Sequence, residues 1–364
     1  MAAKRIGILT GGGDCPGLNA VIRAVAKTAI LDFGLEIVGM EDGYEGLIEH
    51  RSRPLAYNNV SGILSEGGTI LGTSNRANPF GFPVVRADGE TVFEDRSDLV
   101  RDYVKELDLS CLVCIGGDGT LTIAHRLMEE CGVPCVGVPK TIDNDLYGTD
   151  VTFGFDTARQ IATEAIDRLH TTAQSHHRAM VIEVMGRNAG WLALEAGIAG
   201  GGDVILLPEL PHSLEAICER LVSRSRTGRR FSIVVVSEGV ELEGGGQVVR
   251  CEVADSMNAA RLGGVGDVLA ARIEEASGVE TRVTVLGHLL RGGTPSSADR
   301  VLATRYGREA AVCAGTGRHG VMVGLHCGEI VPVPLSEVAG RQRLVPPDHH
   351  LIACARSVGA SFGD

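Results

Sequence analysis

The chain has 364 residues, of which 44% are hydrophobic and 4% are aromatic, and its formal net charge is −12. This length exceeds what one hydrophobic core normally supports, so two domains are expected. The acidic balance argues against nucleic-acid or membrane-surface partners, which need a broad basic face. The few aromatic residues argue against a protein that binds single-stranded nucleic acid by stacking its bases on aromatic rings.

Short hydrophobic runs alternate with amphipathic segments along the chain, which is typical of a mostly parallel α/β sheet. In the first half we expect strands at 5–10, 37–40, 111–115 and 133–138, a helix at 18–31 and an exposed excursion at 78–97. In the second half we expect helices at 156–172, 191–199, 264–277 and 301–314, and strands at 179–184, 204–207, 232–237, 282–286 and 321–325. No hydrophobic run is long enough to span a membrane.

The chain contains ten cysteines, scattered through hydrophobic segments. Cys111 and Cys114 form a C-x-x-C pair that Cys131 and Cys135 follow, so a zinc site is one interpretation. Residues three apart in a strand face opposite sides, which favours buried thiols instead. Free thiols of this kind fit a cytoplasmic protein.

Two glycine-rich loops follow expected strands. In T-G-G-G-D-C-P-G at 10–17, Pro16 replaces the third glycine of G-x-G-x-x-G and no G-K-[ST] follows, which leaves a generic phosphate turn or an ordinary tight turn. In G-G-D-G-T at 116–120, the glycines allow phosphate to approach the backbone, Asp118 is suited to Mg²⁺, and Thr120 is expected to N-cap the next helix. A decorated β-turn is the alternative interpretation of this second loop.

The segment P-K-T-I-D-N-D at 139–145 places Lys140 beside two carboxylates. Asp143 and Asp145 face one side if the loop is extended, so that one can accept a proton while the other orients a metal. A cluster of Asx turns would explain the acidic residues but not the lysine. A cation in an acidic loop suits a phosphoryl group in transfer, and together with the glycine loops it predicts a kinase.

Arginines stand beside glycines at the ends of later strands. Arg187 follows Met185-Gly186, Arg291 follows His288, and Arg178 and Arg282 stand at the starts of two expected strands. Each alone fits a solvated surface residue, but several together suit a sugar phosphate. Glu238, directly after the strand 232–237, is placed to accept hydrogen bonds from sugar hydroxyls.

With these motifs in this order, the chain resembles the 6-phosphofructokinase family over nearly its whole length. The motifs are G-G-D-x-P-G-x-N at 12–19, G-G-D-G-T at 116–120, P-K-T-I-D-N-D at 139–145, M-G-R at 185–187, E-G at 238–239 and G-H-x-x-R-G-G at 287–293. The resemblance implies Mg²⁺-dependent transfer of the ATP γ-phosphoryl group to the C1 hydroxyl of fructose 6-phosphate in glycolysis. It also implies an α/β fold of two Rossmann-like three-layer domains with mostly parallel sheets and an active site between them. Residues 1–154 and 288–345 would form the larger donor-binding domain, and residues 155–287 and 346–364 the smaller sugar-phosphate domain.

The resemblance also implies residue roles. Asp143 would deprotonate the C1 hydroxyl, Thr141 would contact the substrate, and Arg187 would stabilise the transferring phosphoryl group. The implied donor site comprises Gly12, Arg76, Gly117, Asp118 as the Mg²⁺ ligand, Gly119 and Thr120. The implied fructose 6-phosphate site comprises Thr141, Asp143, Arg178, Met185, Gly186, Arg187, Glu238, Arg282, His288 and Arg291. In the family, Arg178 and Arg282 reach the site from a neighbouring subunit, which implies a homodimer or a homotetramer.

Two positions bear on the phosphoryl donor. Family members that use pyrophosphate usually carry Asp at the position of Gly119 and Lys at that of Lys140, so this chain combines an ATP-type glycine with a pyrophosphate-type lysine. A carboxylate at 119 would repel and overlap the nucleotide, whereas Lys140 admits pyrophosphate without excluding ATP, and ATP is therefore expected. Glu41 stands where many ATP-using members have tyrosine near the adenine. Arg23 and Lys27 match basic positions of the bacterial effector site, whose remainder is not traceable.

Three alternatives remain. The first is a pyrophosphate-dependent fructose 6-phosphate 1-phosphotransferase. The second is a non-catalytic sugar-phosphate sensor, against which the presence of Asp118, Asp143 and Arg187 argues. The third is a lipid or NAD kinase, which shares only the G-G-D-G loop.

Overall fold

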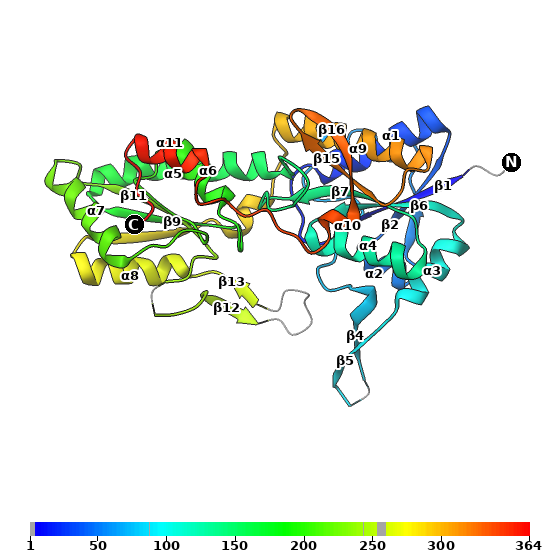
Figure 1. The fold of residues 1–364 in the computed structure, drawn as a ribbon, viewed down its shortest axis with the longest axis horizontal. Coiled ribbons are helices and arrows are strands. Elements are labelled where there is room, and N and C mark those ends of the chain that lie inside the picture. Colours follow the sequence, from blue (N-terminus) through cyan, green and yellow to red (C-terminus); the bar gives the residue numbers. More distant parts are fainter. Residues whose placement is uncertain (1–3, 87, 243, 253–259) are drawn as a thin grey trace.

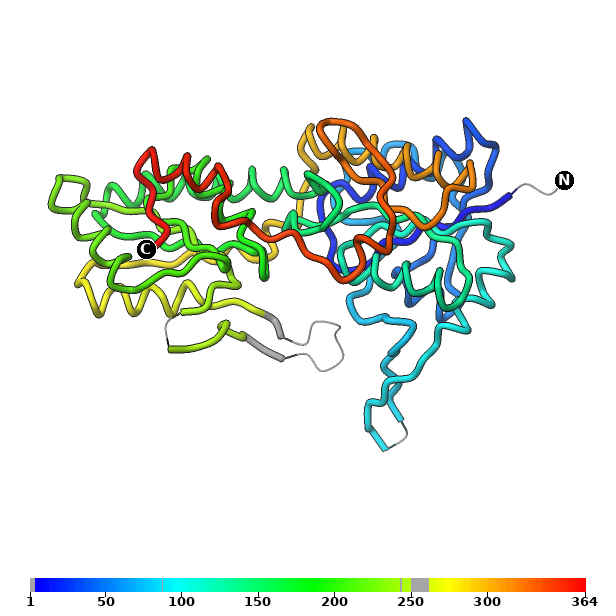
Figure 2. Tube along the Cα trace, viewed as in Figure 1, coloured from blue at the N-terminus to red at the C-terminus, as the bar shows by residue number. Residues whose placement is uncertain are grey.

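The computed structural model describes residues 4–86, 88–242, 244–252 and 260–364, which form two α/β units side by side (Figures 1 and 2). Among these residues the larger sheet has eight strands in the order β16-β15-β7-β6-β1-β2-β3, with β8 paired to β7. They are β1 (Arg5–Thr10), β2 (Glu36–Met40), β3 (Ser52–Pro54), β6 (Leu109–Gly116), β7 (Cys135–Thr141), β8 (Phe153–Gly154), β15 (Val321–His326) and β16 (Glu329–Pro334). The interior strands pair in parallel, whereas β3 and β16 at the edges run antiparallel to their neighbours.

Helices cover both faces of the larger sheet (Figure 1). One face carries α1 (Leu18–Phe33) and α9 (Ser297–Thr316), and the other carries α2 (Tyr44–Ile48), α3 (Ser97–Glu106) and α4 (Asp118–Cys131). The alternation of side chains along β1 explains this: Ile8 joins the core beneath α1 and α9, and Leu9 joins the core beneath the other three helices. Burial on both faces is why the central strands read as continuous hydrophobic runs.

The smaller sheet is parallel throughout and has the order β10-β11-β9-β14. Its strands are β9 (Ala179–Val184), β10 (Val204–Leu206), β11 (Ser232–Ser237) and β14 (Thr281–Val285). The helices α5 (Phe155–His176), α6 (Trp191–Ala199) and α11 (His350–Ser357) lie over one face, and α7 (Leu214–Arg226) and α8 (Val265–Ser277) over the other. Ile182 packs in the first layer and Val181 in the second. The predicted α/β class, with two three-layer units and mostly parallel sheets, is confirmed.

Shorter elements complete the described chain. Two antiparallel pairs are β4 (Phe82–Val85) with β5 (Thr91–Glu94) and β12 (Val249–Glu252) with β13 (Ala260–Leu262), and the remaining helices are α10 (Leu335–Val338) and the 3-10 turns η1 (Ile63–Ser65), η2 (Pro79–Gly81) and η3 (Gly287–Arg291). The segment expected as an exposed excursion is the projecting β4–β5 hairpin (Figure 1), with Phe93 60% exposed. Every helix in the described ranges is too short or too polar to cross a membrane.

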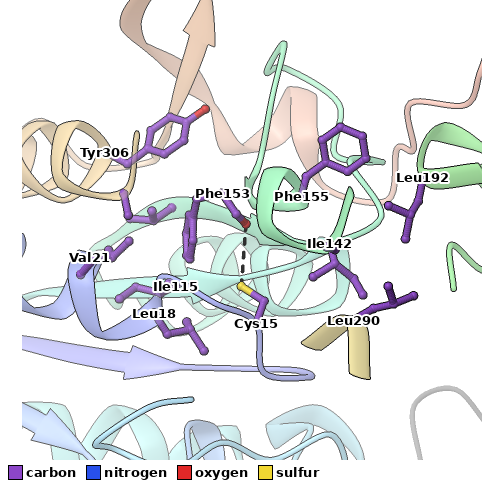
Figure 3. Close-up of a cluster of buried hydrophobic side chains, with 14 of the residues drawn as sticks. Cys15, Leu18, Val21, Ile115, Ile142, Phe153, Phe155, Leu192, Leu290 and Tyr306 are labelled. Carbon is purple, nitrogen blue, oxygen red and sulfur yellow. Dashed lines mark hydrogen bonds between the residues drawn. The ribbon is translucent and has the colours of Figure 1, made fainter. Parts of the chain in front are cut away.

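The hydrophobic core continues from the larger unit into the smaller one (Figure 3). Ile142 and Phe153, which flank the loop between β7 and β8, belong to the same buried cluster as Leu192 of α6. In α9, the buried carboxylate of Asp299 accepts the backbone N–H groups of Gly154 at 2.9 Å and Thr157 at 2.8 Å, where α5 begins. Apolar packing and buried hydrogen bonds therefore join the two units at the ends of their strands.

Candidate functional site

The glycine loops and the acidic loop leave three neighbouring strands of the larger sheet. Strand β6 lies between β1 and β7, and all three run parallel, so the loops after Thr10, Gly116 and Thr141 begin at one edge. A β-carbon added at Gly11 would lie 2.6 Å from Thr120 Oγ1, which shows how closely the first two loops approach each other. The segments that the sequence singled out therefore share one place in the fold.

The first glycine loop is built around close contacts with distant side chains. Gly12 has φ of 76°, in the left-handed region that favours glycine. The Lys140 ammonium donates to the carbonyl of Gly13. A β-carbon at Gly13 would lie 1.7 Å from Nη1 of Arg291, so a larger residue would displace that guanidinium. This loop thus brings two cations to the edge of the sheet.

A further loop flanks this site. The carbonyl of Ser74 accepts the N–H of Gly12 at 3.2 Å, and the hydroxyl of Thr73 donates to the carbonyl of Gly12 at 2.6 Å. Arg76, two residues further along, is exposed. Arg76 therefore follows a loop that bonds to the first glycine loop, and its place in the donor site stays a prediction.

The predicted N-cap role of Thr120 is wrong. Helix α4 begins at Asp118, and its N-cap is Gly117, which makes no side-chain capping bond. Thr120 is the third helical residue, and it is buried against Gly116, where a β-carbon would lie 2.3 Å from the Thr120 side chain. The helix starts three residues earlier than capping by Thr120 requires, because its N-cap is Gly117. Gly119, the second helical residue, is half-buried.

The acidic loop turns at Asn144, between its two carboxylates. The N–H of Asp143 donates to Thr141 Oγ1 at 3.0 Å, and Asn144 has φ of 52°, which asparagine tolerates better than most residues. The Asn144 side chain accepts the N–H of Thr152 at 3.0 Å. Oδ1 of Asp143 is buried and has no hydrogen-bond partner in the described chain. Such an acceptor is costly to keep and is available to a ligand.

Charges of both signs meet around Asp143, which is 7% exposed. Burial raises the pKa of the Asp143 carboxyl, while Arg291, Arg187 and Lys140 act in the opposite direction. Burial also lowers the pKa of Lys140, which is only 4% exposed. The cations come from three different segments, so the fold, and not the local sequence, assembles this group.

The acidic residues of the two loops also repel one another. Burial raises the pKa of Asp145, and repulsion from Asp143 and, more weakly, Asp118 adds to that effect. No group of three or more His, Cys, Asp or Glu side chains within the described ranges can hold a metal unaided. Mg²⁺ normally binds one or two carboxylates together with substrate phosphates, and it would relieve this repulsion. The residues present therefore fit a Mg²⁺ ion that arrives with a phosphate.

The loop after β9 faces the acidic loop from the smaller unit. Arg187 has φ of 48°, and its N–H donates to Oε1 of Glu238 at 3.3 Å. Gly186 has φ of 147°, and a β-carbon at Gly239 would lie 1.6 Å from the carbonyl oxygen of Arg187. Met185 is half-buried at the start of this loop. Two glycines therefore hold the arginine in a left-handed conformation that costs about 1 kcal/mol or more.

Glu238 is a buried carboxylate whose ionisation is costly. Burial raises its pKa to about 7, and repulsion from Asp143 contributes next. The unfolded chain releases this proton near pH 4.3, so between that pH and about 7 the folded protein binds the extra proton. The free energy of unfolding therefore falls as pH rises through this window.

Glu238→Gln should remove that penalty, because the amide is neutral and still offers an oxygen to the N–H of Arg187. We expect the variant to exceed the wild type in stability by about 3 kcal/mol at pH 8 and by only about 1 kcal/mol at pH 5. Urea unfolding of both proteins at the two pH values measures the difference. Equal gains at both pH values would show that the carboxylate is ionised without cost.

Three of the predicted site residues are separated from this group or exposed. Arg178 precedes β9 and pairs with Glu280 at 2.9 Å, and Arg282 at the start of β14 pairs with the same carboxylate at 2.5 Å. Arg187 follows the other end of β9, and a six-residue strand is about 20 Å long. His288 is exposed in η3. The structure therefore gathers Arg187, Glu238 and Arg291 near Asp143. It leaves Arg178 and Arg282 at the opposite ends of the strands, where β9 and β14 begin.

The structure also adds residues that the sequence did not indicate. The segment 340–345, which we name the C-terminal strap, joins α10 to the smaller unit (Figure 1). Its Gly340 N–H donates to Oδ1 of Asp118 at 3.2 Å, and Gln342 donates to Oδ2 of Asp145 at 3.3 Å. The strap has neither a hydrophobic period nor a motif, so nothing in its sequence points to these contacts.

Comparison with known proteins agrees with the fold and the motifs. A model of the phosphofructokinase family matches residues 5–314. The ATP-dependent 6-phosphofructokinase of Spirochaeta thermophila is 52% identical over 363 residues, covering 100% of this chain and 98% of the relative. The pyrophosphate–fructose 6-phosphate 1-phosphotransferase of Streptomyces coelicolor is 50% identical over 359 residues, covering 99% of this chain and 100% of the relative.

A solved structure shows the same architecture. The phosphofructokinase of Pichia pastoris in the T-state matches with a TM-score of 0.79 and 32% identity over 93% of this chain. This chain spans 35% of the length of that protein. Together with the family model, which covers most of the sequence, this match places the loops described above in a known framework. The chain belongs to the phosphofructokinase family.

Proposed function

We propose that this chain is an ATP-dependent 6-phosphofructokinase that acts in the cytoplasm. It transfers the γ-phosphoryl group of ATP to the C1 hydroxyl of fructose 6-phosphate and yields fructose 1,6-bisphosphate and ADP in glycolysis. The observation that carries the proposal is the gathering of Arg187, Arg291 and Lys140 around Asp143, where the glycine loops end. Relatives about 50% identical over the whole chain, whose names state this activity, support it.

Asp143 acts as the general base. Its buried Oδ1 has no partner in the described chain and is free to accept the proton of the C1 hydroxyl. The hydroxyl oxygen then bonds to the γ-phosphorus, and the bond from that phosphorus to the β-phosphate oxygen of ADP breaks. Arg187 and Lys140 oppose the charge that develops on the transferring oxygens, and Thr141 contacts the sugar and accepts the N–H of Asp143.

The larger unit holds the donor, in residues 1–154 and 288–345. The donor site comprises Gly12, Arg76, Gly117, Asp118, Gly119 and Thr120. Backbone N–H groups of the glycine loops and the N-terminus of α4 bind phosphate, as helix N-termini commonly do. Mg²⁺, held by Asp118 together with the donor phosphates, supplies charge neutralisation when it is bound.

The smaller unit, residues 155–287 and 346–364, holds fructose 6-phosphate. The sugar phosphate contacts Met185, Gly186, Arg187 and Glu238 of this unit and Thr141, Asp143, His288 and Arg291 of the larger unit. Arg178 and Arg282 lie where β9 and β14 begin, at the strand ends opposite to the loop of Arg187, and both pair with Glu280. We assign these two arginines to the site of a neighbouring subunit, which makes the active assembly a homodimer or a homotetramer.

Pyrophosphate is the second candidate donor. The Lys140 ammonium bonds to the carbonyl of Gly13 inside the first glycine loop, so a cation stands where a small anionic donor would bind. The relative from Streptomyces coelicolor carries a pyrophosphate-dependent name. Gly119 favours ATP, because an acidic side chain at that position would face the nucleotide phosphates.

One assay decides between the donors. Purified protein is incubated with fructose 6-phosphate, Mg²⁺ and either ATP or pyrophosphate at matched concentrations, and fructose 1,6-bisphosphate is measured. We expect turnover with ATP to exceed turnover with pyrophosphate. Turnover with pyrophosphate alone would replace the donor in this proposal. Tight binding of fructose 6-phosphate without turnover would indicate a sensor and overturn the enzymatic function.

Gly239→Ala should lower kcat/KM for fructose 6-phosphate by about 100-fold. The new β-carbon would lie 1.6 Å from the carbonyl oxygen of Arg187, so the arginine must move by about 1 Å or more. Gly246→Ala is the matched control, because nothing lies within 4 Å of its β-carbon and its φ is not positive. Steady-state kinetics of the two variants test the effect, and equal values would separate Arg187 from catalysis.

A further inference from the structure

The C-terminal strap passes from the larger unit to the smaller one. It begins after α10, beside the larger sheet, and the chain then continues to α11 over the smaller sheet (Figures 1 and 2). Its first residue, Gly340, bonds to Asp118 in the donor loop, as described above. The strap is thus a covalent bridge that contacts the site while it crosses between the units.

Arg343 donates hydrogen bonds to the carbonyl oxygens of two successive residues of the acidic loop. Its backbone N–H donates to the carbonyl of Asp145 at 2.7 Å. Its Nε and Nη2 donate to the carbonyl of Asn144 at 3.3 Å and 3.0 Å. Hydrogen bonds from a guanidinium are stronger than those between neutral groups. Asn144 is the left-handed residue between the two carboxylates, so these bonds fix the backbone that carries Asp143.

The same arginine contacts the loop of Arg187. The guanidinium carbon of Arg343 lies 4.4 Å from the centroid of the Trp191 ring, and Nε1 of Trp191 donates to the carbonyl of Arg343 at 2.8 Å. Trp191 is the first residue of α6, four residues after Arg187, and it is 4% exposed. A cation–π contact and a hydrogen bond therefore join the strap to this loop.

A half-buried carboxylate strengthens this junction. Oε1 of Glu209 accepts the N–H of Val345, in the strap, at 2.9 Å and the N–H of Gly190, next to Trp191, also at 2.9 Å. The strap is therefore held to the start of α6 by its backbone on both sides of Leu344. It does not depend on the stacked guanidinium alone.

We propose that Arg343 is a positioning residue that sets the placement of Asp143 relative to Arg187. This inference rests on the proposed function, because it assigns Arg343 to the geometry of that reaction. Arg343 touches neither reacting group but bonds to the loops that carry both. A displacement of about 1 Å between a base and a phosphoryl-stabilising arginine can cost about 100-fold in rate. Lysine cannot replace Arg343 fully, because its ammonium lacks the planar fork that stacks and donates together.

The kinetic test compares Arg343→Leu with Arg341→Leu. Arg341 is a matched control: it lies in the same strap and its guanidinium carbon stacks 3.6 Å from the centroid of the Tyr147 ring, outside the 143–145 loop. We expect Arg343→Leu to lower kcat by about 10- to 100-fold while KM for ATP changes by less than about threefold. Arg343→Lys should recover part of the loss, and Arg341→Leu should match the wild type.

A double variant shows whether Arg343 acts through Asp143. In an Asp143→Asn background the further loss caused by Arg343→Leu should shrink to about threefold or less, because the base that it positions is already gone. Full additivity of the two losses would overturn the inference. An unchanged kcat in Arg343→Leu, with an active wild type, would also overturn it while leaving the proposed function intact.

Trp191 provides a readout besides activity, since it is the only tryptophan of the chain. Arg343→Leu should shift its fluorescence emission to longer wavelength, and Arg341→Leu should not. If Arg343→Leu does not fold, Arg343→Lys takes its place in both tests. Trp191→Phe, which keeps an aromatic ring but removes the N–H donor and the fluorophore, takes its place in the kinetic test alone. An emission shift in Arg343→Lys together with wild-type kcat would overturn the inference. A wild type without turnover overturns the proposed function first and this inference with it.

Discussion

Asp143→Asn is expected to fold as the wild type does and to lose at least about 100-fold in kcat, because a general base contributes that much or more. The amide has nearly the same shape as the carboxylate but cannot take the proton of the C1 hydroxyl. The substitution also removes a negative charge from a residue that is only 7% exposed. Because burying a charge is costly, the free energy of unfolding should not fall. Steady-state kinetics with ATP and fructose 6-phosphate measure the loss, and circular dichroism checks the fold.

The pH profile gives an independent check on the same residue. Burial raises the pKa of Asp143, although Arg291, Arg187 and Lys140 limit the rise. As pH falls through this raised pKa the base gains a proton, so kcat/KM of the wild type should decline on the acid side. In Asp143→Asn the decline of kcat/KM on the acid side should be absent. Turnover close to the wild-type value in the variant would remove Asp143 from the mechanism.

Gly119→Asp is expected to lower kcat/KM for ATP by about 100-fold or more, because an added carboxylate beside the donor phosphates costs several kcal/mol. The substitution should not unfold the protein. Position 119 lies in the first turn of α4, where an acidic side chain interacts favourably with the helix dipole and where aspartate suits a helix better than glycine.

Binding of fructose 6-phosphate, followed through Trp191 emission, serves as the control for Gly119→Asp. Fructose 6-phosphate is the acceptor, whereas Gly119 is assigned to the donor site. Its affinity should change by less than about threefold. Pyrophosphate turnover is measured in parallel, and we expect it to fall less than ATP turnover. If the variant uses ATP as well as the wild type does, Gly119 does not determine the donor.

Much of the fold follows from local pattern. The strands β1, β9 and β11 and the helix α6 begin and end where the sequence predicted. Strand β7 differs: it runs from Cys135 to Thr141 and includes Lys140, because the two-residue strand β8 pairs with its end. A strand that short has no periodicity to detect. Lys140, which the sequence analysis placed in the acidic loop, is therefore a residue of β7, and it is buried.

The sequence predicted those parts of the candidate site that lie within a single motif. The acidic loop and the glycine loops stand on neighbouring strands, as the parallel pattern implied. The contacts that complete the site are long-range and therefore lie beyond local pattern. Arg343 follows Asn144 by 199 residues, yet it bonds to the carbonyl of that residue. The capping role predicted for Thr120 failed because the helix already begins at Asp118, and the Thr120 side chain packs against Gly116 instead.

The division into a donor domain and a sugar-phosphate domain stays a prediction, as do the roles of the individual site residues. Arg178 and Arg282 show the reason most clearly. Within one chain they pair with Glu280 at the edge of the smaller sheet that lies away from Asp143. Only an assembly that brings this edge to the site of another subunit would give them a substrate to bind.

The central claim is that the glycine loops, Asp143 and Arg187 surround one migrating phosphoryl group. A crystal structure with fructose 6-phosphate and a non-hydrolysable ATP analogue tests it most directly. We predict that the C1 hydroxyl lies within hydrogen-bond reach of Asp143 and about 3–3.5 Å from the terminal phosphorus, with Arg187 on the phosphate oxygens. Ligands bound on separate faces, or a C1 hydroxyl turned away from Asp143, would contradict it.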